Sequence, residues 1–533
     1  MPRYVPQALY DAQLGSGCME GTRVKIINDI IDWIKDQSAQ KIFWLTGWAG
    51  TGKSAIAWTV CSRSRNDPEV LLGGSFFFSR SASSAAQRDV RCMIPTLAQI
   101  LARQSDRFSQ ALADELTHDP DVLHKQISFQ VEALLARPLR ALASSRVAIV
   151  FVIDALDECA DHSNGGGDLD DAGRNHIVSE MLEALVALFN TDAELPVKFL
   201  VTSRPDTHIR DTPVSDHTLS KILRLQTVDK EQVTKDIRLF IAAKLLSTPK
   251  LRTRFTDSDA DMLAQQCDGL FIVATTALKY TFELGHDAAV TRFGTILNAS
   301  RSGLSARAVA PLDRMYTLIL EDAARMDEPG SDGLAAMLQL LAVLLSTRMA
   351  LSVAALADLL GRPTDDARAT LSRLHCVVHV PEDDVEPGLR TLHASFGDYV
   401  SHRAPGGVRM SNSNSHEVSA RAAVRVMAER LHFNISQSRS SYEPNAPTMP
   451  SGITPSLQYA CTQWVYHIAS LQDPSALNET LRDIFCPRFL FWLEVMSVLG
   501  QVQRAAAMLH FIGVTVRQTS LRDKYRLLMQ ARR

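Results

Sequence analysis

The stretch Lys41-Ile42-Phe43-Trp44-Leu45-Thr46-Gly47-Trp48-Ala49-Gly50-Thr51-Gly52-Lys53-Ser54 decides the fold. It begins as an apolar run typical of a strand, passes through a glycine-rich turn, and is followed by helix-forming residues. Strand, turn ending in Gly-Lys-Ser, and helix is the setting of a P-loop. Glycines let backbone N–H groups surround a phosphate, and the helix N-terminus adds unpaired donors. The sequence therefore predicts phosphate binding by Gly47, Trp48, Ala49, Gly50, Thr51 and Gly52, with Lys53 at the β- and γ-phosphates and Ser54 on Mg²⁺.

A second apolar run, residues 147–153, ends at Asp154 and is followed by Asp157 and Glu158. Its β-branched residues predict a parallel strand that is buried on both faces. Ligands of open α/β sheets bind at the carboxyl edge of such strands. We expect Asp154 to hold Mg²⁺, directly or through water, and Glu158 or Asp157 to orient or polarise the attacking water.

A third strand is predicted over residues 197–205, and it ends in Thr202-Ser203-Arg204. Parallel strands would place these residues beside the carboxylates. Arg204 could sense or stabilise the γ-phosphate. The alternative is a structural ion pair with Asp206, but the order of the strands favours the sensor role.

The bulk composition indicates a multi-domain globular chain. A length of 533 residues suggests about three or four domains. The formal net charge of −3 gives no support for nucleic acid or a membrane surface as a partner. Eight scattered cysteines without metal-ligand spacing favour reduced thiols and a cytoplasmic location.

The strand pattern stops near residue 225, and the rest of the chain has mostly helical periodicity. Two helices followed by a hairpin over residues 350–393 give the order of a winged helix, but no helix there carries the basic face expected of a DNA reader. We expect Thr22 and Ser258 to cap helices, and Asp161 to Asn175 and Ser436 to Ser456 to form mobile loops. The predicted fold class is an α/β P-loop NTPase, a parallel sheet flanked by helices, followed by helical lid, winged-helix and α-helical domains. The predicted parts are a leader (1–21), the NTPase core (22–225), a helical lid (226–300), a winged-helix domain (301–405) and a C-terminal helical domain (406–533).

This order of motifs resembles the NACHT-type STAND NTPases, in particular the fungal nephrocystin-3-like set related to NOD-like receptors. The resemblance runs from about residue 18 to about residue 510, and relatives often carry sensor repeats beyond such a region. The matching segments are Gly21-Thr22-Arg23, the P-loop, Phe76-Phe77-Phe78-Ser79-Arg80, Asp154 to Glu158, Thr202 to Pro205, Gly269-Leu270-Phe271-Ile272 and Leu392-His393-Ala394-Ser395-Phe396. The resemblance implies that Thr22 and Arg23 contact the nucleotide. It also implies that His393 touches the β-phosphate of ADP, with packing at a strand end as the alternative. Phe271 stands where many relatives have a proline that contacts adenine.

The function implied is a signalling switch that binds ATP or ADP with Mg²⁺. Nucleotide exchange would open the lid and allow self-assembly into a homo-oligomer, and slow hydrolysis would reset it. Its partner proteins are unknown, and fungal non-self recognition is the process that the resemblance suggests. The alternatives are a P-loop ATPase of another class, such as an AAA+ protein or a small-molecule kinase, and a nucleotide-bound scaffold. ATP is preferred over GTP because Thr234-Lys235-Asp236 has its aspartate one position too early for a guanine-reading loop.

Overall fold

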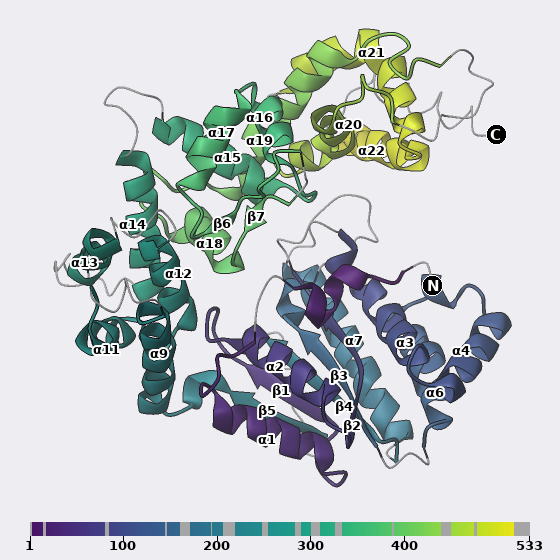
Figure 1. Cartoon of the computed structure of the whole chain (residues 1–533). Coiled ribbons are helices and arrows are strands. Elements are labelled where there is room, and N and C mark those ends of the chain that lie inside the picture. The colour runs from purple at the N-terminus through teal and green to yellow at the C-terminus, as the bar shows by residue number, and fades with distance from the viewer. Residues whose placement is uncertain are drawn as a thin grey trace. The chain divides into compact units, whose positions relative to one another are not determined.

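The computed structural model divides into two compact units, one formed by described residues up to Met315 and the other by those from Tyr316 onwards (Figure 1). The structure describes residues 3–13, 17–79, 85–143, 147–159, 171–192, 194–205, 219–247, 254–282, 289–299, 310–325, 333–385, 388–438, 449–473 and 477–515. Among these, no helix is both long and apolar enough to cross a membrane.

A five-stranded parallel sheet forms the centre of the first unit, in the order β2-β3-β4-β1-β5. Its strands are β1 (Ile42–Thr46), β2 (Val70–Phe77), β3 (Ala148–Asp154), β4 (Val197–Ser203) and β5 (Ser220–Arg224). The register pairs Thr46 with Ser203 and Phe77 with Asp154. The ends of four strands therefore meet at one edge, where the P-loop also begins.

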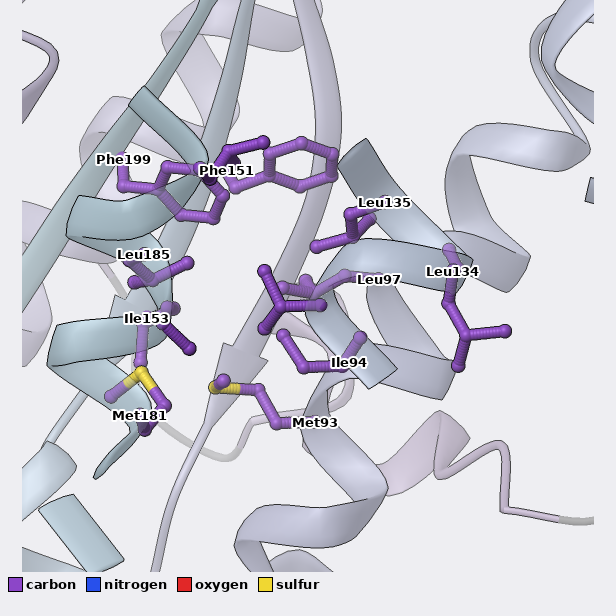
Figure 2. Packing of buried hydrophobic residues seen from close by; sticks show 14 of the residues in the cluster. Met93, Ile94, Leu97, Leu134, Leu135, Phe151, Ile153, Met181, Leu185 and Phe199 are labelled. Atoms are coloured by element: carbon purple, nitrogen blue, oxygen red, sulfur yellow. The ribbon is translucent and has the colours of Figure 1, made fainter. Parts of the chain in front are cut away.

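Both faces of the sheet are covered by helices. Along β3, Phe151 and Ile153 belong to one buried cluster, whereas Val150 and Val152 belong to the other. This alternation is what a strand with two buried faces requires, and it confirms that prediction. On one face lie α1 (Val24–Lys35) and α2 (Lys53–Arg65), and on the other lie α3 (Met93–Ala102) and α7 (Asp171–Thr191). Figure 2 shows the cluster beneath α3 and α7, which contains Phe151 and Ile153. The predicted fold class is confirmed.

Residues 127–140 form one continuous helical run in which a π-helical turn separates two α-helical parts. The run consists of α5 (Ile127–Val131), the π-helical turn (Glu132–Ala136) and α6 (Arg137–Arg140). Pro138 at the start of α6 has no N–H to donate, so a regular hydrogen-bond ladder cannot run through this point. A further helix, α4 (Asp106–His118), was not predicted.

Helices follow the sheet in the first unit: α9 (Lys230–Leu245), α11 (Asp257–Gln266), α12 (Phe271–Phe282) and α13 (Ala289–Ala299). The predicted caps are both wrong. Thr256 caps α11 through a reciprocal capping box with Asp259, which places Ser258 inside the helix. The Thr22 hydroxyl donates to Met19 O instead of capping α1.

The second unit is almost entirely helical. Helix α14 (Pro311–Arg325) leads into it, and two helices and a hairpin follow in the predicted order. Its elements are α15 (Gly333–Ser346), α16 (Val353–Leu360), α17 (Thr364–Ser372), β6 (Val378–His379), β7 (Arg390–Thr391), α18 (Ala394–Asp398), α19 (Asn412–Arg430), α20 (Pro455–Ala469), α21 (Asn478–Val498) and α22 (Val502–Thr515).

The two predicted mobile loops lie largely outside the described residues. Within the first, residues 171–175 are helical, because α7 begins at Asp171. The loop prediction is therefore wrong for that part, and residues 161–170 are not described. Of the second, residues 439–448 are not described, and α20 already begins at Pro455.

Candidate functional site

The glycine-rich turn lies between β1 and the first residue of α2, Lys53, as the sequence predicts. Gly50 and Gly52 have φ of +81° and +95°, a conformation that glycine adopts without steric cost. The N–H of Gly47 donates to Ser203 O at 3.3 Å, so the turn is tied to the end of β4. The backbone therefore has the form that can surround a phosphate group.

The Lys53 ammonium rests on the turn itself. Its Nζ donates to Gly47 O at 2.8 Å and to Trp48 O at 3.2 Å. Burial lowers the pKa of Lys53, and the charges of Asp157 and Asp154 oppose that fall. A phosphate would offer this cation stronger acceptors than two neutral carbonyl groups.

Asp154 ends β3 and is only 2% exposed. Thr202, at the end of the neighbouring strand, donates to Asp154 Oδ1 at 2.6 Å. Burial raises the pKa of Asp154, whereas hydrogen bonds from Thr202 and Ser54 and the charge of Lys53 oppose the rise. One carboxylate and one hydroxyl, completed by phosphate oxygens and water, suit Mg²⁺. Asp154 and Ser54 thus fit the predicted ion.

The chain turns sharply after Asp154, because Ala155 has φ of +53° and a short 3₁₀ turn follows (Leu156–Glu158). This turn brings Asp157 to Arg204. The Arg204 N–H donates to Asp157 Oδ1 at 3.0 Å, and Nε lies 3.1 Å from Oδ2. Asp157 is thus a partner of Arg204; Asp206, the partner considered from sequence, is outside the described residues.

Arg23 joins the P-loop to the helices that follow the sheet. Its Nη2 donates to Thr51 O at 2.9 Å, its backbone N–H donates to Asp236 Oδ2 at 3.1 Å, and its guanidinium lies 5.0 Å from the centre of the Phe271 ring. The next residue, Ile272, donates its N–H to Gly50 O at 3.2 Å. A Cβ on Gly50 would lie only 2.1 Å from Ile272 Cγ2. Helix α12 therefore contacts the P-loop directly, whereas α9 reaches it through Arg23.

Asp236 and Ile272 were missed as site residues. The available signal for Asp236 was a carboxylate on the apolar face of its helix, where Val233 and Ile237 also lie. The available signal for Ile272 was its place in the family-matching segment Gly269-Leu270-Phe271-Ile272, but an apolar residue at the start of a helix did not by itself point to the P-loop.

Thr22 and His393 are the two remaining residues that were predicted to contact the nucleotide. Thr22 is buried, with its hydroxyl bonded to Met19 O, beside Arg23. His393 belongs to the second unit, where it is the N-cap of α18 and its Nδ1 accepts the Ser395 N–H at 3.1 Å. Its contact with ADP stays a prediction.

Residues 21–204 match the model of the family described as nephrocystin 3, N-terminal. No curated protein matches the chain.

Among solved structures, the chain is similar to a signal-transduction ATPase with numerous domains (STAND) and a tetratricopeptide-repeat sensor from Pyrococcus horikoshii. The two chains are 9% identical, the match covers 99% of this chain and 67% of that one, and the TM-score is 0.39. It is also similar to Cdc6p from Pyrobaculum aerophilum (11% identity, 71% and 94% coverage, TM-score 0.33) and to AMPPCP-bound DnaA from Aquifex aeolicus (13% identity, 70% and 90% coverage, TM-score 0.27).

Proposed function

We propose that this chain, whose residues 21–204 match the family described as nephrocystin 3, N-terminal, is a NACHT/STAND-like P-loop NTPase that acts as an ATP- and ADP-binding switch with slow Mg²⁺-dependent ATP hydrolysis. The observation that carries the proposal is the convergence of Lys53, Ser54 and Asp154 at the carboxyl edge of the sheet. A cation for phosphates stands beside a hydroxyl and a carboxylate for a metal ion. This combination is the working set of a P-loop nucleotide site.

The chain's own residues supply the following steps. The N–H groups of residues 47–52 bind the phosphates, and Lys53 leaves the carbonyls of Gly47 and Trp48 for the β- and γ-phosphate oxygens. Ser54 and Asp154 would hold Mg²⁺, which would supply positive charge to the phosphates. Glu158 orients the attacking water, and Arg204 turns from Asp157 towards the γ-phosphate.

The switch part of the proposal is supported by the contact of helix α12 with the P-loop and by the link from α9 through Arg23. Because Ile272 packs on Gly50, a P-loop that changes shape on binding nucleotide must push or release the start of α12. We propose that exchange of ADP for ATP opens this arrangement and exposes a surface for homo-oligomer formation. Partner proteins of unknown identity would then read the oligomer, in a cytoplasmic pathway of the non-self-recognition kind.

The test is nucleotide binding and mass in solution. Lys53→Ala should lose most affinity for ATP and ADP in calorimetric titrations, because it removes the ammonium that the P-loop aims at the phosphates. Lys25→Ala, an exposed lysine on α1, is the matched control and should bind normally. Wild-type affinity in Lys53→Ala would overturn the site. An equal mass with ADP and with a non-hydrolysable ATP analogue would overturn nucleotide-driven assembly.

A further inference from the structure

We infer that Asp236, on helix α9, is a positioning residue for the nucleotide site, because it holds Arg23 where the guanidinium lies between the P-loop and the Phe271 ring. The inference rests on the proposed nucleotide-binding function and adds a point at which the helices after the sheet control nucleotide affinity. Asp236 lies 213 positions from Arg23 in the sequence.

The first support is the backbone of Arg23. This residue has φ of +56°, in the left-handed region that a side-chain-bearing residue enters only at a conformational cost. Asp236 Oδ2 accepts the Arg23 N–H at 3.1 Å, and the Gln232 amide donates to Asp236 Oδ1 at 3.0 Å. Each carboxylate oxygen thus has a fixed donor, so the aspartate is itself held in one orientation.

The second support is charge. Arg23 and Asp236 are 4% and 6% exposed, so neither charge is solvated by bulk water. Burial lowers the pKa of Arg23, and the negative charge of Asp236 opposes that fall. A buried guanidinium without a nearby carboxylate would leave the site for solvent. Asp236 therefore keeps the Arg23 cation beside Thr51.

The third support is the unused hydrogen-bonding capacity of Arg23. Nη2 donates to Thr51 O, but Nε and Nη1 are buried and have no hydrogen-bond partner among the described residues. Buried donors of this kind are uncommon, and an acceptor atom of a bound nucleotide would satisfy them. The fraction of molecules with Arg23 in this position therefore sets the observed nucleotide affinity.

The fourth support is how α9 meets the rest of the unit. A cavity of about 350 Å³ lies between residues 17–19, α2 and α9, with Trp58 and Phe240 among its walls. Over this area α9 is separated from α2, and the contact of Asp236 with Arg23 joins α9 to the segment that precedes α1. Loss of that contact would free α9 and Arg23 together, which couples the helices to the nucleotide.

The decisive variant is Asp236→Asn, which keeps the shape and an acceptor oxygen but removes the charge. We expect its affinity for ADP to fall about tenfold or more, and amide exchange of Arg23 in the nucleotide-free protein to speed up by a similar factor. Glu231→Gln makes the same chemical change at an exposed position of α9, and both values should stay within about twofold of wild type. If Asp236→Asn folds poorly, Gln232→Leu takes its place in the test. This change only frees the aspartate to rotate, and it should show the same two effects in weaker form.

A double variant separates positioning from general stability. Because Asp236 acts through Arg23, Arg23→Met with Asp236→Asn should bind ADP no more weakly than Arg23→Met alone. Additive losses, or wild-type ADP affinity in Asp236→Asn, would overturn the inference. If the wild-type protein binds no nucleotide, the proposed function fails on its own. The exchange measurement still decides on Asp236, since an Arg23 amide that exchanges equally fast in wild type and Asp236→Asn overturns its role.

Discussion

Thr202, the penultimate residue of β4, and Asp154, the last residue of the neighbouring β3, are joined by a 2.6 Å hydrogen bond. The same hydroxyl accepts the Ala155 N–H at 3.0 Å. One side chain therefore fixes both the carboxylate proposed for Mg²⁺ and the turn that carries Asp157 and Glu158.

Thr202→Val should weaken Mg²⁺-dependent ATP binding. The change preserves shape but removes a hydrogen bond to a charged group, worth about 1.5–3 kcal/mol, or roughly ten- to a hundredfold in affinity. Titrations with and without EDTA measure the effect. Thr46→Val is the matched control, because the Thr46 hydroxyl is buried on β1 without a hydrogen-bond partner among the described residues. Equal losses in the two variants, or none in Thr202→Val, would contradict the prediction.

Glu158→Gln should keep ATP affinity and slow single-turnover hydrolysis about a hundredfold, because the amide cannot orient water, or accept a proton from it, as a carboxylate does.

Asp157→Asn should instead release Arg204, whose Nε forms an ion pair with the Asp157 carboxylate. It should therefore change the response to the γ-phosphate, seen as the ratio of ATP to ADP affinity. Normal hydrolysis in Glu158→Gln together with slow hydrolysis in Asp157→Asn would exchange the two roles.

A comparison of His393→Ala with His393→Asn separates helix capping from nucleotide contact. Alanine removes the cap of α18 and should cost about 1 kcal/mol of stability, whereas asparagine is a good N-cap. If the imidazole binds the β-phosphate, both variants should release ADP roughly ten- to a hundredfold faster, as expected for one hydrogen bond to a charged group. Stopped-flow ADP release and melting temperature are the measurements. Normal ADP release in His393→Asn would leave the residue with a capping role alone.

Stability of the second unit should fall below about pH 6.5, the usual pKa of histidine. His467 is fully buried between His416 Nδ1 at 2.9 Å and the Tyr459 hydroxyl at 2.7 Å. Burial, together with the charges of His416 and Arg348, lowers the pKa of His467 well below its usual value. The unfolded chain then binds a proton that the folded unit does not, so the free energy of unfolding falls by up to about 1.4 kcal/mol per pH unit on acidification.

Urea unfolding between pH 5 and 7.5 checks this dependence. His467→Phe should lower stability at every pH but flatten the slope. His432→Gln, at an exposed position, should leave the slope unchanged. A wild-type slope in His467→Phe would assign the acid sensitivity to other groups.

The sequence predicted the parts of the site that depend on local pattern. The P-loop, the strand ending at Asp154 and the strand ending at Ser203 are each continuous segments whose residue types determine their form. Parallel pairing then brings their ends together, because carboxyl ends share one edge.

Features that depend on distant partners were not predictable. Strand β5 carries Lys221 and Arg224 in five residues and, among the described strands, pairs with β1 alone at the sheet's edge, so it lacks a buried strand's apolar run. The capping residue of α11 depended on which of two neighbouring hydroxyls reached Asp259. The role of Asp236 required knowing that α9 lies beside Arg23.

The contact of Gly50 with Ile272 limits where a recombinant fragment of this chain can end. A recombinant fragment that stops at residue 225 keeps the whole sheet but loses Asp236, Phe271 and Ile272. Such a fragment would lack the Ile272 side chain that packs on Gly50 and the Asp236 carboxylate beside the Arg23 cation. A fragment meant to report native nucleotide binding should therefore run through α12 to Phe282. By the same reasoning, a P-loop segment transplanted between relatives needs its matching α9 and α12 transplanted with it.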